Sequence, residues 1–332
     1  MKLYKLLVTG FFILFVTGTL NASALERDDI RGFIDEMSTK HGFKPDELRE
    51  IFQKVEFSKS VIEAISRPAE ILPWYRYRPI FLEADRIRDG VKFWQENSKA
   101  LGEVEDKYGV PAELVVAIIG VETRYGRLKG KYMVINSLST LAFDYPQRGS
   151  FFRSELEQYL LMTREQGFDP LSLKGSYAGA MGIPQFISSS FRSYAVDFNT
   201  DGIIDIWEDM EDAIGSVGNY FKVHGWVKGG MVAVPARVEG NDYKNIVTDE
   251  LKPEITASEL NKYRISTDAE LSPGTMAKLL VLENRQDNEY WLGFENFYVI
   301  TRYNHSMLYA LAVFQLAEEI KSRYLKNSKQ VR

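Results

Sequence analysis

The sequence predicts a mainly α-helical protein with one small β-rich region, and three features of its 332 residues support this fold class. Apolar residues recur at helical spacing over long stretches, most densely from Pro111 to Gly130. Between residues 231 and 300 the pattern changes to short β-branched or aromatic runs separated by Gly, Pro, Asn and Asp. Hydrophobic residues make up 45% of the chain and aromatic residues 13%, which is enough for a large core.

The composition excludes several classes of function. The chain contains no Cys, so it has no disulfide, no cysteine nucleophile, no thiolate metal site and no lipid attached through cysteine. Its three His residues are scattered, which argues against a His-rich metal centre. The formal net charge is −5 and no block of basic residues is present, so we expect no binding of nucleic acid.

The first residues have the three-part layout of a secretory signal peptide. Lys2 and Lys5 form a basic start, an apolar run continues to Leu20, and small residues lead up to Ala24. The apolar run is short for a membrane-spanning helix, although an uncleaved anchor is the alternative. Removal of residues 1–24 takes away two Lys and changes the net charge from −5 to −7. We therefore expect a signal peptide and an exported, soluble protein without covalent lipid.

An N-terminal α subdomain is expected from residue 25 to residue 110. Helices are predicted at Arg31–Lys40 and at Pro45–Gln53, since a proline and two acidic residues open the second one. A longer charged helix is predicted near Ile80–Tyr108. The aromatic and basic segment Trp74–Pro79 lies before it, and its bounding prolines do not favour helix.

The stretch 111–230 combines apolar helices with Gly-rich loops, and its first helix carries a candidate catalytic acid. Glu122 follows apolar residues three, four and seven positions before it, so it shares their buried stripe. A carboxyl group in apolar surroundings resists ionisation and can act as a general acid near neutral pH. The alternative is a structural ion pair with Arg124 or Arg127, because buried ion pairs also perturb acids.

A Gly-rich loop at Gly175–Phe186 is a candidate ligand-binding segment. Three glycines and three Ala or Ser residues fall within eight positions, which lets a bulky ligand approach the backbone. Gln185 can donate and accept hydrogen bonds, as a sugar hydroxyl or an N-acetyl amide requires. Phe186 can stack on a sugar face. A plain Gly-rich turn is the alternative interpretation.

The segment Asp197–Glu208 fits the spacing of an EF-hand calcium loop at every specified position. Gly202 supplies the sharp turn, and Ile203 would offer its backbone carbonyl. An acidic surface turn is the alternative. Because the chain has one such loop, a structural ion is a better interpretation than a calcium sensor. The remaining oxygen ligands at the EF-hand positions would come from Asp197, Asn199, Asp201 and Asp205.

The β-rich region is expected to form a small subdomain over residues 231–300, after which the chain returns to helix. A final helix is predicted at Ser306–Lys326, within a C-terminal segment 301–326 that returns to the core. The predicted strands are Met231–Val238, Lys278–Glu283 and Phe297–Thr301.

Four motifs in this order resemble those of the membrane-bound lytic murein transglycosylase B family. They are Val121–Gly126, Leu141–Pro146, Gly175–Phe186 and Asp212–Phe221. The resemblance extends from about Arg31 to about Leu316. It implies a lysozyme-like α-helical core at 111–230, flanked by the α and β subdomains in one transglycosylase unit at 25–320. It also implies one EF-hand-type calcium loop at 197–212 and action on peptidoglycan in the periplasm.

The resemblance assigns roles to individual residues. Glu122 matches the single catalytic acid of the family. Gln147 stands where the family usually has Arg, which puts one substrate contact in doubt. The substrate-binding residues that the resemblance implies are Tyr77, Arg148, Ser176, Gln185, Phe186, Tyr220, Tyr303, Asn304 and Tyr309. The implied ligands of a structural Ca²⁺ are Asp197, Asn199, Asp201, the Ile203 carbonyl and Asp212, with Glu208 as runner-up to Asp212.

The implied reaction cleaves the β-1,4 bond between N-acetylmuramic acid and N-acetylglucosamine and forms a 1,6-anhydro ring. In this family one Glu serves as acid and then as base. A lysozyme-type hydrolase is one alternative, and it would need a second carboxylate, for which Asp144 is the candidate near in sequence. A non-enzymatic, calcium-dependent cell-wall-binding protein is the other. The expected partners are peptidoglycan glycan strands and other cell-wall enzymes, and we expect a monomer.

Overall fold

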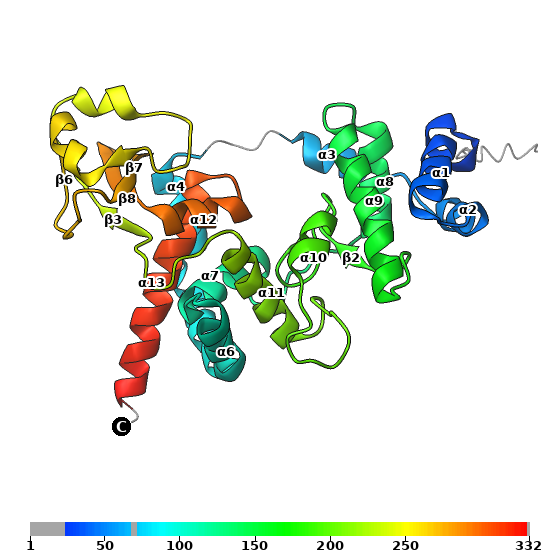
Figure 1. The fold of residues 1–332 in the computed structure, drawn as a ribbon, viewed down its shortest axis with the longest axis horizontal. Helices are drawn as coiled ribbons and strands as arrows, with labels where there is room; N and C mark the ends of the chain where they lie inside the picture. The colour runs from blue at the N-terminus through cyan, green and yellow to red at the C-terminus, as the bar shows by residue number, and fades with distance from the viewer. Residues whose placement is uncertain (1–23, 68–71, 331–332) are drawn as a thin grey trace, which may run out of the picture. The chain divides into compact units, whose positions relative to one another are not determined.

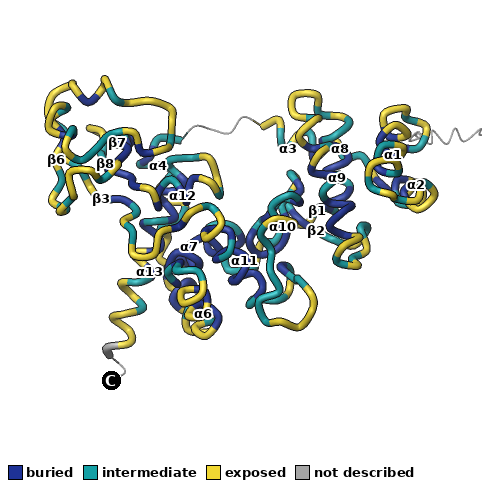
Figure 2. The backbone as a smooth tube through the Cα atoms, viewed as in Figure 1, coloured by how far each residue is buried: buried dark blue, intermediate teal, exposed yellow. Residues whose placement is uncertain are grey.

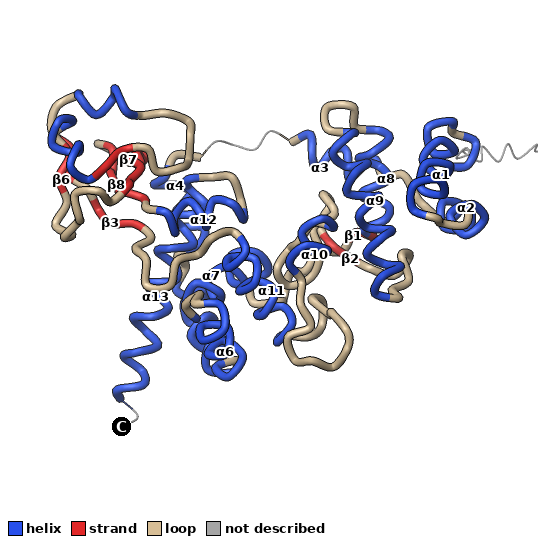
Figure 3. Tube along the Cα trace, viewed as in Figure 1, coloured by secondary structure: helices blue, strands red, loops and turns tan. Residues whose placement is uncertain are grey.

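The computed structural model describes residues 24–67 and 72–330, and these residues are mostly helical with small sheets (Figures 1 and 3). The described chain divides into two compact units, residues 24–55 and residues 56–330. The predicted signal peptide, residues 1–24, lies outside the described residues except for Ala24. No helix within the described ranges is long and apolar enough to cross a membrane.

The first unit contains the two helices that the sequence predicts there. After a short 3₁₀ turn, η1 (Ala24–Glu26), the chain forms α1 (Asp28–His41) and α2 (Pro45–Gln53). Gly42 ends α1 in the left-handed conformation, which glycine adopts without steric cost. The rings of Phe33 and Phe52 meet edge to face at 5.9 Å between centroids and join the two helices.

The second unit is built mainly from helices. They are α3 (Lys59–Ser66), α4 (Trp74–Phe81), α5 (Ala84–Glu96), α6 (Ser98–Tyr108), α7 (Ala112–Thr123), α8 (Val134–Asp144), α9 (Gly149–Gln166), α10 (Ser188–Tyr194), α11 (Met210–Val223), α12 (Glu295–Tyr303) and α13 (Met307–Gln330). Its strands are β1 (Tyr132–Met133), β2 (Lys174–Gly175), β3 (Ala233–Pro235), β4 (Arg237–Val238), β5 (Ile255–Thr256), β6 (Ile265–Ser266), β7 (Met276–Glu283) and β8 (Asn288–Gly293). Two 3₁₀ turns are η2 (Asp242–Ile246) and η3 (Ala257–Tyr263).

Two predictions for the region before α7 were wrong. Residues 74–81 form a helix although Pro79 lies within it, because a proline near the end of a short helix removes only one backbone donor. The single long helix predicted near 80–108 is instead divided among three helices. The first residues of this range belong to the end of α4, and the rest form α5 and α6. The side-chain amide of Asn97 donates to the carbonyl of Phe93 at 2.9 Å, and α5 ends there.

Helix α7 lies at the centre of the core of the second unit (Figure 2). All its residues from Ala112 to Gly120 are buried, and it packs against α5, α6, α11 and α13. The close packing needs a glycine at position 120, since a Cβ atom there would lie 2.6 Å from the hydroxyl oxygen of Tyr125. An apolar helix of this kind carries the polar residues at its C-terminal end into a buried setting.

The β-rich region forms an antiparallel sheet in the order β3-β8-β7-β5. The strand predicted at Phe297–Thr301 was wrong, because these residues lie in α12. A short apolar run fits a buried helix and a buried strand equally well, and here most of its residues are buried on helical turns. The amide of Asn296, in the same helix, hydrogen-bonds to Val227 and Gly230 and so joins α12 to the segment before β3.

Candidate active site

Glu122 lies in the last turn of α7 and forms one short hydrogen bond. The hydroxyl of Tyr309, in α13, donates to Oε1 of Glu122 at 2.5 Å. Burial raises the pKa of Glu122 from 4.5 to about 7, while the hydrogen bond from Tyr309 acts in the opposite direction. This carboxyl group can therefore hold or release a proton near neutral pH.

Neither arginine that follows Glu122 pairs with it. Arg124 forms an ion pair with Glu83 at 2.8 Å, and Arg127 pairs with Asp89 at 2.5 Å. Within the described residues Glu122 has no ion pair. The structure therefore does not contain the structural ion pair that was the alternative interpretation of Glu122.

Three tyrosines from different elements surround the Glu122 carboxyl group. Burial and the charge of Glu122 together raise the pKa values of Tyr77, Tyr303 and Tyr309. The Tyr303 hydroxyl donates to the carbonyl of Pro184 at 2.6 Å, which connects α12 to the Gly-rich loop. All three hydroxyls therefore stay neutral near pH 7, and of the three it is Tyr309 that donates its hydrogen to the carboxylate.

The Gly-rich loop Gly175–Phe186 has a fixed conformation. The Oγ atom of Ser176 accepts from the backbone N–H groups of Ala178 and Ala180, at 3.3 and 3.0 Å. Gln185 adopts a left-handed conformation with φ 54°, and its amide donates to the carbonyl of Gly182 at 2.9 Å. Turns held by side-chain hydrogen bonds of this type present their polar groups in one orientation.

Phe186 and Tyr220 lie inside an aromatic cluster with Tyr303. The ring centroids are 5.7 Å apart for Phe186 and Tyr220, and 4.8 Å apart for Tyr220 and Tyr303. Phe186 is 2% exposed and Tyr220 is 7% exposed. Phe186 is therefore largely covered by neighbouring rings in this structure, and the expectation that its face stacks on a sugar stays a prediction.

Thr123, next to Glu122, is a site residue that the sequence analysis did not select. Its buried hydroxyl donates to the carbonyl of Ile183 at 2.9 Å and accepts from the N–H of Gly126 at 3.0 Å. It thereby fixes the end of α7 to the Gly-rich loop. Its position beside the candidate acid within Val121–Gly126 was the available signal.

Arg148 and Asn304 are predicted site residues, but the structure does not connect them to Glu122 or to the Gly-rich loop. Both are exposed, and within the described residues neither hydrogen-bonds to Glu122 or to the loop that follows Gly175. The guanidinium of Arg148 instead lies 4.3 Å from the ring centroid of Phe151. Asp144, the candidate second carboxylate, is exposed and does not contribute to the pKa of Glu122.

The acidic loop after residue 196 is organised by its own side chains. Asp197 accepts from the N–H groups of Asp201 and Gly202, at 3.1 and 2.8 Å. Asn199 accepts from Asp201 at 2.9 Å, and Asp201 accepts from Ile203 at 2.9 Å. The side chains at loop positions one, three and five therefore all accept hydrogen bonds from the same backbone turn, residues 201–203.

Asp212 hydrogen-bonds to the backbone at the base of this loop, whereas Glu208 pairs with a residue outside the loop. The buried carboxylate of Asp212 accepts from the N–H groups of Phe198 and Asp205, at 2.7 and 2.8 Å. Glu208 is exposed and pairs with Nζ of Lys129 at 2.6 Å. Lys129 also accepts, through its backbone carbonyl, a hydrogen bond from Gln185 at 3.3 Å, so the acidic loop is joined to the Glu122 site.

Comparison with known proteins places these features in a family. The family described as Transglycosylase SLT domain matches residues 26–318. A relative from Escherichia coli strain K12, membrane-bound lytic murein transglycosylase B, is 44% identical over 298 residues, in an alignment that covers 87% of this chain and 81% of the relative.

Three solved structures are similar to the chain over most of its length. Catenated lytic transglycosylase SltB1 from Pseudomonas aeruginosa has a TM-score of 0.86 and 48% identity, covering 90% of this chain and 98% of its own. The Escherichia coli lytic transglycosylase Slt35 in complex with calcium has a TM-score of 0.83 and 44% identity, covering 90% and 94%. Pseudomonas aeruginosa SltB3 in complex with NAG-anhNAM-pentapeptide has a TM-score of 0.79 and 33% identity, covering 88% and 79%.

Proposed function

This chain belongs to the transglycosylase SLT domain family and is a lytic transglycosylase acting on peptidoglycan, and we propose that Glu122 serves as its single acid and base. The bond cleaved is the β-1,4 linkage between N-acetylmuramic acid and N-acetylglucosamine. The product ends in 1,6-anhydro-N-acetylmuramic acid. The ligand of the SltB3 structure, NAG-anhNAM-pentapeptide, supports this assignment of the product.

In the first step, protonated Glu122 donates its proton to the oxygen that links the two sugars. The bond from this oxygen to carbon 1 of the muramoyl residue breaks, and the N-acetylglucosamine side leaves with a free hydroxyl. Positive charge of oxocarbenium character develops on the muramoyl ring. The N-acetyl group of the substrate stabilises this charge, in place of a second carboxylate of the enzyme.

In the second step, the Glu122 carboxylate accepts the proton of the muramoyl 6-hydroxyl group. The oxygen of that hydroxyl bonds to carbon 1 and closes the anhydro ring. No water is consumed, and Glu122 returns to its protonated form. A pKa near 7 suits both steps, because the acid and base forms are both accessible near neutral pH.

The observation that carries this proposal is the electrostatic setting of Glu122. Burial raises the pKa of Glu122, and only the hydrogen bond from Tyr309 opposes this effect. Within the described residues, no second carboxylate contributes to the shift of this pKa. A lysozyme-type hydrolase would place a second carboxylate beside the acid. A protein that only binds the cell wall would have no need of an acid held near neutrality.

The products of purified peptidoglycan test the proposal. We expect muropeptides lighter by one water than the products of hydrolysis, measured by mass spectrometry. Products with a free reducing end as the main species would favour the hydrolase. Absence of any cleavage by the folded protein would favour the wall-binding alternative.

We further propose that one Ca²⁺ stabilises the loop at 197–212. Within the described residues, no three acidic or histidine side chains are gathered as a metal site. The proposal is therefore supported by the calcium-loop spacing of the sequence and by the calcium complex of the similar Slt35 structure. Carboxylate, amide and carbonyl oxygens are the donors that Ca²⁺ prefers. The ion would neutralise the acidic loop and take no part in the chemistry. The proposed ligands are Asp197, Asn199, Asp201, the Ile203 carbonyl and Asp212.

The substrate contacts, domain boundaries, monomeric state and location of the protein are part of the same proposal. We propose that the glycan strand contacts Tyr77, Arg148, Ser176, Gln185, Phe186, Tyr220, Tyr303, Asn304 and Tyr309, several of them as supporting side chains. The proposed subdomains are 25–110, 111–230, 231–300 and 301–326.

A signal peptide cleaved after Ala24 would place the enzyme in the periplasm. A mature protein that begins at Leu25 in the soluble fraction is the expected finding, and a membrane-retained species with Met1 intact would contradict it.

A further inference from the structure

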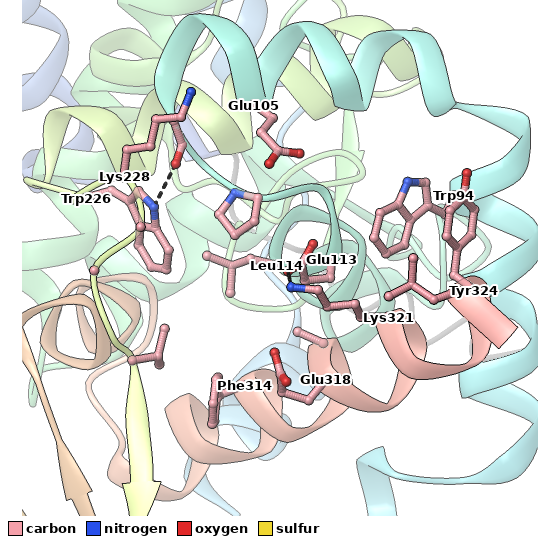
Figure 4. Close-up of a pocket in the computed structure, with 17 residues that line it drawn as sticks. Trp94, Glu105, Glu113, Leu114, Trp226, Lys228, Phe314, Glu318, Lys321 and Tyr324 are labelled. Carbon is pink, nitrogen blue, oxygen red and sulfur yellow. Dashed lines mark hydrogen bonds and ion pairs between the residues drawn. The ribbon is translucent and has the colours of Figure 1, made fainter. Parts of the chain in front are cut away.

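A cavity of about 560 Å³ lies at the end of α7 that is remote from Glu122 (Figure 4). Its walls come from α5, α6, the first turn of α7, α13 and the segment before β3. Glu113 lines the cavity, and it is nine residues before Glu122 in the same helix, or about 14 Å along the axis. None of the side chains around Glu122 lines the cavity. A cavity of this size accommodates a small ligand or one large side chain.

The floor of the cavity is aliphatic. Leu114, Ala317 and Pro111 line it together with the ring of Phe314. Leu325, at the rim, is 49% exposed although it is apolar. An apolar side chain that enters the cavity would therefore remove apolar surface from water on both sides of the contact.

The aromatic rings of the cavity are already engaged by the protein. The rings of Trp94 and Tyr324 stack on each other at 4.2 Å with 11° between their planes. Trp226 is 6% exposed, and its indole N–H donates to the carbonyl of Gly109 at 3.0 Å. Stacking occupies one face of Trp94 and one face of Tyr324, and Trp226 is buried, so the cavity favours an aliphatic side chain over a glycan.

The charged residues of the cavity leave an excess of negative charge. Lys321 donates to Oε1 of Glu113 at 2.7 Å, and its charge also interacts with those of Glu318 and Glu105. Glu105 and Glu318 are exposed at the rim, and within the described residues their side chains make no hydrogen bond or ion pair. Lys228 is the other lysine of the lining. Three carboxylates thus face two ammonium groups, which favours a cationic ligand.

We propose that this cavity binds a segment of a partner polypeptide in which a basic side chain neighbours an aliphatic one. The aliphatic side chain fills the space over Leu114, and the basic side chain reaches Glu105 and Glu318. The site is separate from Glu122, so the proposal does not depend on the proposed reaction. Binding is expected to be unchanged in the inactive Glu122→Gln protein.

Titration with short blocked peptides tests the site. The probe is the acetylated and amidated tripeptide Lys-Leu-Lys, and the control is the matched peptide Glu-Leu-Glu. We expect Lys-Leu-Lys to shift the indole N–H resonances of Trp94 and Trp226 in a saturable manner, and Glu-Leu-Glu to leave them unchanged. Equal shifts with both peptides, no shift with Lys-Leu-Lys, or the same shifts with a trimer of N-acetylglucosamine would overturn the proposal.

Paired charge variants give the sharper measurement. The double variant Glu105→Gln/Glu318→Gln removes the two rim carboxylates and should weaken the binding of Lys-Leu-Lys about three- to tenfold, as expected for exposed charge pairs. The control Glu103→Gln/Glu319→Gln removes two exposed carboxylates from the same two helices outside the cavity. Leu325→Ser should also weaken binding, by loss of apolar contact. Equal affinity of the two double variants, or unchanged affinity in Leu325→Ser, would contradict the proposed site.

Discussion

Tyr309 and Glu122 are 187 positions apart in the sequence, and the hydroxyl of Tyr309 donates to the Glu122 carboxylate at 2.5 Å. The hydrogen bond favours the ionised carboxylate, whereas burial favours the protonated form, and burial has the larger effect. The pKa of about 7 is therefore a balance of two opposed contributions. Changing either one should move the pH dependence of the reaction in a defined direction.

Substitution of Tyr309 by Phe should move the alkaline limb of the pH–rate profile to higher pH. The variant lacks the hydrogen bond that lowers the pKa of Glu122, so the proton is retained further into the alkaline range. The profile of kcat/KM on peptidoglycan measures this shift. Tyr303→Phe is the matched control, because the Tyr303 hydroxyl donates to Pro184 and not to Glu122. A shift to lower pH in Tyr309→Phe would contradict the assigned role of this bond.

Glu122→Gln should lower the rate of glycan cleavage by at least about 100- to 10,000-fold, the usual contribution of general acid–base catalysis. The substitution keeps the size of the side chain and its hydrogen-bonding capacity, so folding and binding to peptidoglycan should persist. Glu319→Gln, an exposed position in α13, is the control and should retain activity. An active Glu122→Gln enzyme would show that another residue is the acid.

The same variant should reveal a pH-dependent cost of the buried carboxyl group. Since the pKa of Glu122 is raised from 4.5 to about 7, the folded state binds a proton more tightly than the unfolded state does. The free energy of unfolding therefore falls as pH rises from about 4.5 to about 7, by up to about 3 kcal/mol. Glu122→Gln escapes this loss, so its stability relative to wild type should rise between pH 5 and pH 8. Chemical denaturation at pH 5 and at pH 8 measures the free energy of unfolding of both proteins. The same difference between variant and wild type at the two pH values would contradict the shifted pKa.

Calcium should raise the melting temperature of the wild-type protein, because an ion that binds only the folded state stabilises it by mass action. Asp212→Ala should abolish most of this increase, since its buried carboxylate hydrogen-bonds to the backbone at the base of the loop. Glu208→Ala should retain the increase, because Glu208 is directed to Lys129. Differential scanning calorimetry with and without calcium provides the measurement. Loss of the effect in Glu208→Ala alone would assign the ligand to Glu208.

Local pattern was sufficient for much of this fold. The apolar stripe before Glu122 predicts a buried helix that ends in a partly shielded acid, and α7 is that helix. Pro45 and the acidic residues after it predict the start of α2. The change after residue 230 to short β-branched or aromatic runs predicts strands, and most strands of the second unit lie there.

The remaining features depend on contacts between residues distant in sequence. No local rule indicates that Tyr309 reaches Glu122, or that Tyr303 and Tyr220 bury the ring of Phe186. The run Phe297–Thr301 has the composition of a strand, and only its packing in the core selects helix. Glu208 fits the EF-hand spacing, but its position is set by Lys129, 79 residues earlier in the chain.

Digestion of peptidoglycan in oxygen-18 water tests the central claim most directly. If Glu122 transfers the proton of the muramoyl 6-hydroxyl group, the oxygen that closes onto carbon 1 comes from the substrate itself. The account predicts muropeptides that end in 1,6-anhydro-N-acetylmuramic acid and carry no label at carbon 1, measured by mass spectrometry. Labelled reducing ends as the main product would show that water attacks carbon 1 and would contradict the single acid–base mechanism.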